Sequence, residues 1–166
     1  MNMDKVIREH IEVIRDECKK EIINITDQSN SLEIDNIIKK LDHIFPDSVV
    51  NNPNYIKIFY NISTYAYFLT MNTPEECIGM LAMYANDQQS KEAYISLIGI
   101  ENEYQGYHLG EILLELAIIY AKKVGMSSIK LEVNSKNEKA IKFYKKNGFN
   151  FLKKASEKTE YLLKKI

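Results

Sequence analysis

The 166-residue sequence contains no tryptophan, only three prolines and six glycines, and no long hydrophobic run. With so little glycine and proline, it lacks the low-complexity segments and flexible linkers that stay disordered. Residues 1–16 carry charges throughout and lack the apolar core of a signal peptide. No later stretch approaches the roughly 18 apolar residues that span a bilayer. We therefore expect a soluble, cytoplasmic protein that does not associate with a membrane.

Cysteine is also scarce. Cys18 and Cys77 are the two cysteines, and neither lies in a CxxC pair or beside a group of histidines. A disulfide framework needs paired cysteines, and a structural zinc site needs closely spaced Cys and His ligands. The sequence therefore predicts no disulfide and no bound metal.

The residues that are present suit one globular domain. Hydrophobic residues make up 45% of the chain, which is enough for a continuous core. Charge is uneven: residues 1–121 contain 9 Lys and Arg against 19 Asp and Glu (net -10), and residues 122–166 contain 13 against 4 (net +9). Such a split can attract a cationic ligand to one region and an anionic one to the other. The total of -1 predicts no nucleic-acid binding.

Hydrophobic spacing predicts an order of elements. Helical spacing occurs over residues 6–23 and 32–41, with a polar break at residues 26–31, and a short third helix follows over residues 51–61. The remaining elements are expected to be three strands, a helix, a strand, a short helix and a closing hairpin, over residues 65–71, 77–84, 93–100, 107–124, 129–133, 137–147, 149–154 and 161–166.

The connections decide the fold class. The first three strands are joined by short turns and form an antiparallel meander. The strand, helix and strand between residues 95 and 133 require a parallel crossover. A mixed, mostly antiparallel sheet of six to seven strands with helices on both faces, an α/β fold, accounts for this order.

One candidate binding segment is IGIENEYQGYHLG, residues 98–110, which leads from a predicted strand directly into the long helix. Unsatisfied backbone N–H groups at a helix start, together with the helix dipole, make a site for a phosphate or pyrophosphate. The segment therefore predicts an anion site at this turn.

This loop resembles the acetyl-CoA loop of the GNAT family of N-acetyltransferases, in which Gln or Arg is followed by two variable residues, Gly, one variable residue and then Gly or Ala. Gln105 and Gly110 match the ends of that pattern, and His108 stands in place of the middle Gly. The family Gly lets the backbone approach the pyrophosphate closely. A side chain can crowd the site, although His tolerates unusual backbone angles better than most residues.

A second segment, NEKAIKFYKKNGF, residues 137–149, is similar to the closing motif of the same family: Asn, Ala, an aromatic-Tyr pair and Gly-Phe. Helical spacing places Ala140 and Tyr144 on one face, and Gly148 can take the left-handed conformation that ends a helix. In the family, the tyrosine at the place of Tyr144 gives a proton to the departing sulfur of CoA. A phenol is protonated at neutral pH and able to donate.

The resemblance implies a single GNAT acetyltransferase domain over residues 1–166, with a variable acceptor side at residues 1–75 and an acetyl-CoA-binding core at residues 76–166. It implies that the pantetheine arm pairs with the main chain of residues 98–100. Asn137 would approach the cofactor from a helix start, a role that competes with that of an N-cap. The residues expected at acetyl-CoA are Ile98, Gly99, Ile100, Gln105, Gly106, Tyr107, His108, Leu109, Gly110, Glu111, Asn137, Ala140, Phe143 and Tyr144.

An attacking amine must lose a proton, so a base or a water path is needed as well as an acid. Glu132 interrupts the apolar alternation of its strand, and N-terminal acetyltransferases of the family often carry a catalytic Glu in a similar Leu-Glu-Val setting. Histone-type members place Glu early in the preceding strand, where this chain has Tyr94. The catalytic candidates are therefore Tyr144 as acid and Glu132 as base, with water past Tyr94 as the alternative to Glu132.

The resemblance further implies transfer of an acetyl group from acetyl-CoA, a co-substrate, to the primary amine of a small amine, amino sugar or amino acid. The amine would attack directly within a ternary complex. A protein or peptide N-terminal acetyltransferase is the first alternative, and a non-catalytic acyl-CoA-binding module is the second. Family members frequently pair through their sheets or C-terminal strands, so a homodimer is also implied.

Overall fold

A computed structural model describes residues 23–166, so the helix predicted over residues 6–23 lies outside the described part except for its last residue. No helix in the described part is long and apolar enough to cross a membrane. With η marking a 3-10 helix, the elements are β1 (Asn24–Asp27), α2 (Ser31–Leu41), η1 (Asp42–Ile44), α3 (Tyr55–Tyr65), β2 (Ala66–Asn72), β3 (Cys77–Tyr84), β4 (Glu92–Ile100), η2 (Asn102–Tyr104), α4 (Leu109–Lys123), β5 (Ser128–Asn134), α5 (Glu138–Lys146), β6 (Asn150–Lys154) and β7 (Thr159–Lys165).

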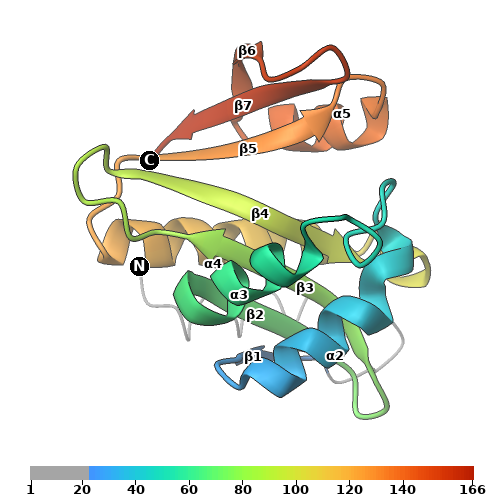
Figure 1. Ribbon diagram of the computed structural model, residues 1–166. Coiled ribbons are helices and arrows are strands. Elements are labelled where there is room, and N and C mark those ends of the chain that lie inside the picture. The colour runs from blue at the N-terminus through green and yellow to red at the C-terminus, as the bar shows by residue number, and fades with distance from the viewer. Residues whose placement is uncertain (1–22) are drawn as a thin grey trace.

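The described strands form one seven-stranded sheet in the order β1-β2-β3-β4-β5-β7-β6 (Figure 1). β4 and β5 run parallel, and every other neighbouring pair is antiparallel. The predicted mixed sheet is thus confirmed, with its antiparallel meander from β2 to β4, its parallel crossover through α4 and its closing hairpin of β6 and β7.

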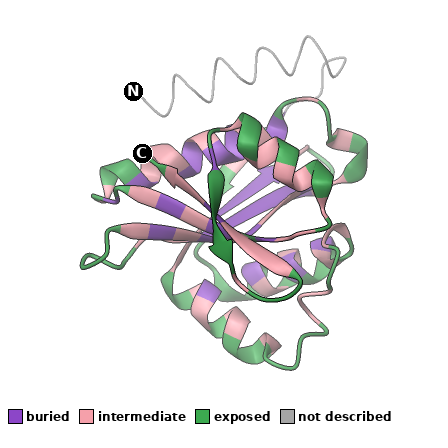
Figure 2. Cartoon of the chain, turned by 90° about the horizontal axis from the view of Figure 1, so that it is seen from above, coloured by how far each residue is buried: buried purple, intermediate pink, exposed green. Residues whose placement is uncertain are grey.

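Helices cover both faces of the sheet, as predicted. α4 and α5 pack on one face, over a core that includes Leu113, Leu131 and Phe149. α2 and α3 pack on the opposite face, over a second core that includes Ile38 and Phe68. Figure 2 shows the buried residues along the strands and on the inner sides of the helices. The two sides are called the α4–α5 face and the α2–α3 face below.

Two elements differ from the prediction. The polar break expected from residue 26 begins inside an edge strand, β1, because Ile23 and Ile25 pack into the core of the α4–α5 face while the polar residues between and beyond them are exposed. The third helix, α3, begins at Tyr55 rather than at residue 51. Before it, the side chain of Asn52 accepts a hydrogen bond from the backbone N–H of Asn54, which keeps these residues in a turn.

β4 contains a bulge at Ser96. Ala82 on β3 pairs with Leu97 and Met83 pairs with Ile95, so Ser96 has no partner on β3. The extra residue changes which side chains face each side of the sheet. Ile95 therefore lies in the core of the α4–α5 face and Leu97 in that of the α2–α3 face. Pairing with β5 ends at the same place, because Ile95 is the last β4 residue in register with β5.

A histidine links the α2–α3 face to the loop after β4. His43 Nε2 lies 2.9 Å from Glu101 Oε2, and its Nδ1 lies 3.0 Å from the carbonyl oxygen of Lys40. Both partners are acceptors, so the two hydrogen bonds form together only when both ring nitrogens carry a proton. The hydrogen bond to Glu101 accordingly raises the pKa of His43 above its usual value.

We predict that this link stabilises the fold only while His43 is charged. Because the pKa is higher in the folded chain, the contribution is complete below the unfolded value of about 6.5 and is lost as the pH rises through the folded value. Measured by urea denaturation from about pH 6 to about pH 9, the free energy of unfolding should fall more steeply for the wild type than for His43→Gln. Glu101→Gln should behave like His43→Gln, and parallel curves for all three proteins would contradict the prediction.

Candidate active site

The candidate site lies where β4 and β5 separate. Residues 92–95 of β4 pair with residues 128–131 of β5, and beyond them the strands continue to Ile100 and Asn134 without pairing to each other. Figure 1 shows the two ribbons diverging toward their C-terminal ends. Main-chain groups on this side of β4 therefore lack a strand partner, and an extended ligand can pair with such groups as an added strand would.

The side chains at the end of β4 are occupied by packing. Ile98 and Ile100 lie in the core of the α4–α5 face. On the other side, a Cβ added to Gly99 would lie 2.5 Å from Cδ1 of Ile44. Residues 98–100 can therefore offer a ligand mainly their backbone. Gln105 reaches back to this strand end, where its Nε2 donates a hydrogen bond to the carbonyl oxygen of Ile100 at 3.1 Å.

The loop between β4 and α4 has a left-handed backbone at two positions. Gly106 has φ +91°, and a Cβ added there would meet nothing within 4 Å. His108, the N-cap of α4, has φ 63° and ψ 13° and makes no side-chain capping hydrogen bond. The first N–H groups of α4 therefore have no partner in the His108 side chain, and open space lies beside Gly106. This arrangement suits a pyrophosphate, because those N–H groups and the helix dipole favour an anion.

His108 thus holds a backbone conformation that glycine adopts more readily. Its ring is half exposed, and Nδ1 lies 3.5 Å from Oε1 of Glu111. Lys146 Nζ on α5 lies 3.7 Å from the same oxygen. By contrast, Leu109 is buried and Tyr107 is half-buried in the core, so Leu109 can offer a ligand only its backbone.

α5 contacts the loop from the side. A Cβ added to Gly110 would lie 3.1 Å from Cζ of Phe143, so α4 and α5 approach closely only because this position has no side chain. Lys139 on α5 donates a hydrogen bond to Oε1 of Gln105. These contacts bring together the two segments from which the family resemblance was inferred.

The start of α5 is capped by Asn137. Its Oδ1 accepts a hydrogen bond from the backbone N–H of Ala140 at 3.1 Å. This is the N-cap role that the sequence left open, and it satisfies one N–H group at the helix start. Ala140 itself is half-buried in the core of the α4–α5 face. A contact of Asn137 or Ala140 with acetyl-CoA stays a prediction.

Tyr144 lies on the α4–α5 face between two aromatic rings. The centroids of Phe143 and Phe149 lie 5.3 and 5.8 Å from that of Tyr144, both in edge-on orientations. Burial raises the pKa of Tyr144 to about 12. Its hydroxyl has no hydrogen-bond partner within residues 23–166, and it is not among fully buried atoms that lack one, so it borders solvent-accessible space. A protonated phenol with an unused donor can act as an acid.

Glu132 lies on the α2–α3 face, because its neighbours Leu131 and Val133 point into the opposite core. The side chain is exposed. Its Oε1 accepts a hydrogen bond from Oγ1 of Thr159 at 2.5 Å, and it forms no ion pair within the described residues. The two catalytic candidates, Tyr144 and Glu132, therefore do not touch and lie on opposite faces of the sheet near the separation of β4 and β5.

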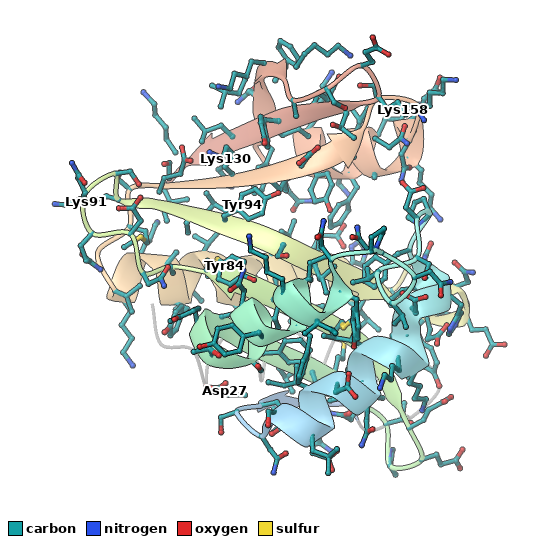
Figure 3. All side chains as sticks on the ribbon, viewed as in Figure 1. Asp27, Tyr84, Lys91, Tyr94, Lys130 and Lys158 are labelled. Atoms are coloured by element: carbon teal, nitrogen blue, oxygen red, sulfur yellow. The ribbon has the colours of Figure 1, made fainter. Side chains whose placement is uncertain are left out.

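Strand register places one tyrosine opposite Glu132 and two more in a row across β3 and β4. Tyr84 on β3 pairs with Tyr94 on β4. Tyr161 on β7 pairs with Glu132. Figure 3 shows Tyr84, Tyr94 and Lys130 following one another from β3 to β5. We call Tyr84, Tyr94 and Tyr161 the tyrosine row. Burial, with the charge of Glu132, raises the pKa of Tyr94 to about 12, so its phenol is neutral at neutral pH and is no base.

Sequence reasoning missed Ser96, Lys139 and Thr159 at this site. Lys139 was one of many lysines, and nothing in its spacing indicated the bond to Gln105. For Thr159 the sequence did contain a usable signal. Thr159, Tyr161 and Leu163 alternate along one strand, which puts Thr159 and Tyr161 on the same face. Within residues 23–166, no three His, Cys, Asp or Glu side chains are grouped so as to hold a metal ion.

Solved structures share this architecture. The PaiA N-acetyltransferase from Thermoplasma acidophilum, solved in complex with coenzyme A, superposes with a TM-score of 0.68 at 19% identity over 87% of this chain and 99% of that chain. The ribosomal-protein-S18-alanine N-acetyltransferase from Escherichia coli gives 0.66 at 21% identity over 87% and 94%. An Arabidopsis thaliana protein in complex with the bisubstrate analogue CoA-Ac-MVNAL gives 0.68 at 21% over 87% and 99%. The fold is therefore that of N-acetyltransferases.

Sequence comparison identifies the family. The model of the acetyltransferase (GNAT) family matches residues 34–149, so the chain belongs to this family. An uncharacterized N-acetyltransferase of Methanocaldococcus jannaschii is 37% identical over 65 residues, 39% of this chain and 29% of that protein. The mycothiol acetyltransferase of Propionibacterium freudenreichii is 24% identical over 66 residues, 40% of this chain and 21% of that protein. The matched segments thus span less than a third of either relative.

We predict that His108→Gly is more stable than His108→Ala. A left-handed backbone costs a non-glycine residue about 1–2 kcal/mol. Glycine avoids that cost but loses more conformational freedom on folding, which offsets about half of the gain. Urea denaturation should therefore give the Gly variant a free energy of unfolding about 0.5–1 kcal/mol above that of the Ala variant. Equal stabilities would show that the loop does not hold residue 108 in the left-handed conformation.

Proposed function

We propose that this protein transfers the acetyl group of acetyl-CoA to a primary amine of a small molecule, namely a small amine, an amino sugar or an amino acid. The amine attacks directly while both substrates are bound. The observation that carries the proposal is the Tyr144 hydroxyl, which has no hydrogen-bond partner in residues 23–166 and borders solvent-accessible space. Tyr144 lies on α5, the helix that packs against the start of α4 beside the candidate pyrophosphate loop between β4 and α4. A binding module without catalysis has no need of such a donor.

In the proposed mechanism, each face of the sheet carries one proton transfer. The amine nitrogen attacks the carbonyl carbon of the thioester, the C–N bond forms, and the C–S bond breaks. The amine must lose a proton, and the thiolate of CoA must gain one. We assign the first proton to Glu132 on the α2–α3 face and the second to Tyr144 on the α4–α5 face. Two substrates that enter from opposite faces would meet where β4 and β5 separate.

The pKa of Tyr144 limits what this residue does. A phenol with a pKa of about 12 is a weaker acid than an ordinary thiol, whose pKa is about 8.5. Complete transfer of its proton to a thiolate would cost roughly 5 kcal/mol at that difference. Tyr144 therefore acts first by donating a hydrogen bond to the sulfur as negative charge develops on it, and its proton passes fully to the sulfur only as water returns a proton to the phenol. Such a bond is stronger in the transition state than in the ground state, which is what catalysis requires.

The surroundings of Glu132 support an amine as acceptor. Its carboxylate makes no ion pair within the described residues, whereas the neighbouring Lys130 is paired with Glu92. The ammonium of Lys130 also lies 5.3 Å from the ring centroid of Tyr161. Ammonium groups bind favourably over tyrosine rings and beside a carboxylate. An acceptor amine with an apolar stem therefore suits the tyrosine row.

A protein or peptide N-terminus is the second candidate acceptor. The Escherichia coli neighbour is named for acetylation of an alanine of a ribosomal protein, and the Arabidopsis neighbour was solved with a peptide-bearing analogue. The exposure of Glu132 favours this acceptor as well, because a peptide needs an open approach. Both candidates present a primary amine to the same face of the sheet, so the size of the acceptor separates them.

A panel of acceptors tests the proposal. Phenethylamine, glucosamine, phenylalanine and short peptides with free N-termini would be incubated with acetyl-CoA, and release of the CoA thiol would be followed with a thiol reagent. We expect release with at least one small amine, at a rate proportional to protein concentration. Release with peptides alone would favour the N-terminal acceptor. Binding of acetyl-CoA without release for any amine would overturn the proposal in favour of a binding module.

We predict that Tyr144→Phe lowers kcat by at least about 100-fold, the usual contribution of a positioned proton donor. Acetyl-CoA binding, measured by calorimetry, should stay within about twofold, because the aromatic ring is retained. The melting temperature should also be unchanged, since the hydroxyl has no partner within the described residues to lose. Unaltered turnover of the panel amine would exclude the assigned role. Phe143→Leu, which keeps the hydroxyl of Tyr144 and alters its packing, is the matched comparison.

A further inference from the structure

The hydroxyl of Thr159 defines the position of Glu132. It lies 2.5 Å from Glu132 Oε1 and 2.8 Å from the hydroxyl of Ser156. An ionised carboxylate is only an acceptor, so the single hydroxyl proton of Thr159 points to Glu132. The Ser156 hydroxyl must then donate to Thr159. The three side chains form a directed chain of hydrogen bonds from the β6–β7 turn to the carboxylate.

The backbone of this turn is fixed on both sides. The carbonyl oxygen of Thr159 accepts hydrogen bonds from the N–H groups of Ala155 and Ser156, at 3.0 and 3.2 Å. The hydroxyl of Ser156 accepts from the N–H groups of Lys158 and Thr159, each at 3.1 Å. Across the sheet, Thr159 pairs with Asn134 on β5. Thr159 therefore presents its hydroxyl from a rigid position.

Glu132 needs such an anchor. Its side chain is exposed on an uncovered part of the α2–α3 face, and an exposed glutamate that nothing holds samples many rotamers. The bond from Thr159 occupies Oε1, while Oε2 has no hydrogen-bond or ion-pair partner within residues 23–166. One oxygen is thus tethered and the other is available to a proton.

We propose that Thr159, supported by Ser156, is a positioning residue of acetyl transfer: it holds the carboxylate of Glu132 so that Oε2 takes the proton of the acceptor amine. The inference rests on the base role proposed for Glu132. It also gives the β6–β7 turn a part in catalysis, although the turn bears no acid or base of the reaction. Preorganising a base in this way lowers the barrier, because the group need not be ordered during the reaction.

A purely structural role is the rival explanation, because the same hydrogen bond joins β5 to β7. The two roles differ in what they affect. A cross-strand bond contributes to folding, so its loss lowers the melting temperature and leaves the kcat of the folded fraction unchanged. A positioning bond contributes to the transition state, so its loss lowers kcat, and this loss depends on the carboxylate of Glu132.

The test is a double-mutant cycle with the panel amine that gives the fastest thiol release. Thr159→Val keeps the branched shape and removes the hydroxyl, and we expect kcat to fall roughly tenfold with the KM for acetyl-CoA within about twofold. Thr159→Ser restores the hydroxyl and should recover kcat to within about twofold. Glu132→Gln should lower kcat by about 100-fold or more, and adding Thr159→Val to it should cause no further loss.

Thr73→Val is the matched control, because Thr73 uses its hydroxyl in a surface turn between β2 and β3. It should leave kcat unchanged. If Thr159→Val keeps the wild-type kcat while Glu132→Gln is impaired, the positioning role is excluded and the base role stands. If Glu132→Gln keeps the wild-type kcat, both roles fail. In that case Tyr144→Phe still tests acetyl transfer itself.

Discussion

The site depends on the separation of two parallel strands. β4 pairs with β5 up to Ile95 and then leaves it, at the residue before the Ser96 bulge. A strand in the middle of a sheet normally has both edges paired, and unpaired N–H and C=O groups are costly when buried. The separation therefore creates an edge inside the sheet that a ligand can complete. The proposed place of acetyl-CoA and the two proposed proton transfers on opposite faces all depend on where this edge begins.

α4 and α5 pack against each other on the α4–α5 face. The two helices approach through Gly110 and Phe143, and Lys139 on α5 donates a hydrogen bond to Gln105 in the loop before α4. Because these contacts fix α5 against α4, Tyr144 on α5 is held on the same side of the sheet as the loop between β4 and α4. Part of the excess positive charge of residues 122–166 is used in these contacts, since Lys139 binds Gln105 in the loop before α4 and Lys146 pairs with Glu111 in the first turn of α4. Lys142 and Lys145, the remaining lysines of α5, form no ion pair within residues 23–166, and their charge can attract an anionic ligand.

Much of this fold could be predicted from the sequence, because its signals are local. Alternating and helical apolar spacing located the strands and helices, and the long connection through α4 required a parallel pair. β1 escaped prediction because its four residues are mostly polar and only Ile25 marks them as an edge strand. The bulge at Ser96 also escaped, because a single extra residue is visible only against the partner strand.

The candidate site shows the same division between local and long-range information. The αL conformation of His108 and the cap at Asn137 follow from short-range chemistry, so the sequence could suggest both. The placement of Glu132 and Tyr144 on opposite faces could not be read from their 12-residue separation, because it depends on which face α5 covers. Thr159 lies 27 residues from Glu132 and reaches it only through the pairing of β5 with β7. The acid proposed here is positioned by helix packing and the proposed base by strand register, so substitutions in either element should affect one of the proposed proton transfers and leave the other intact.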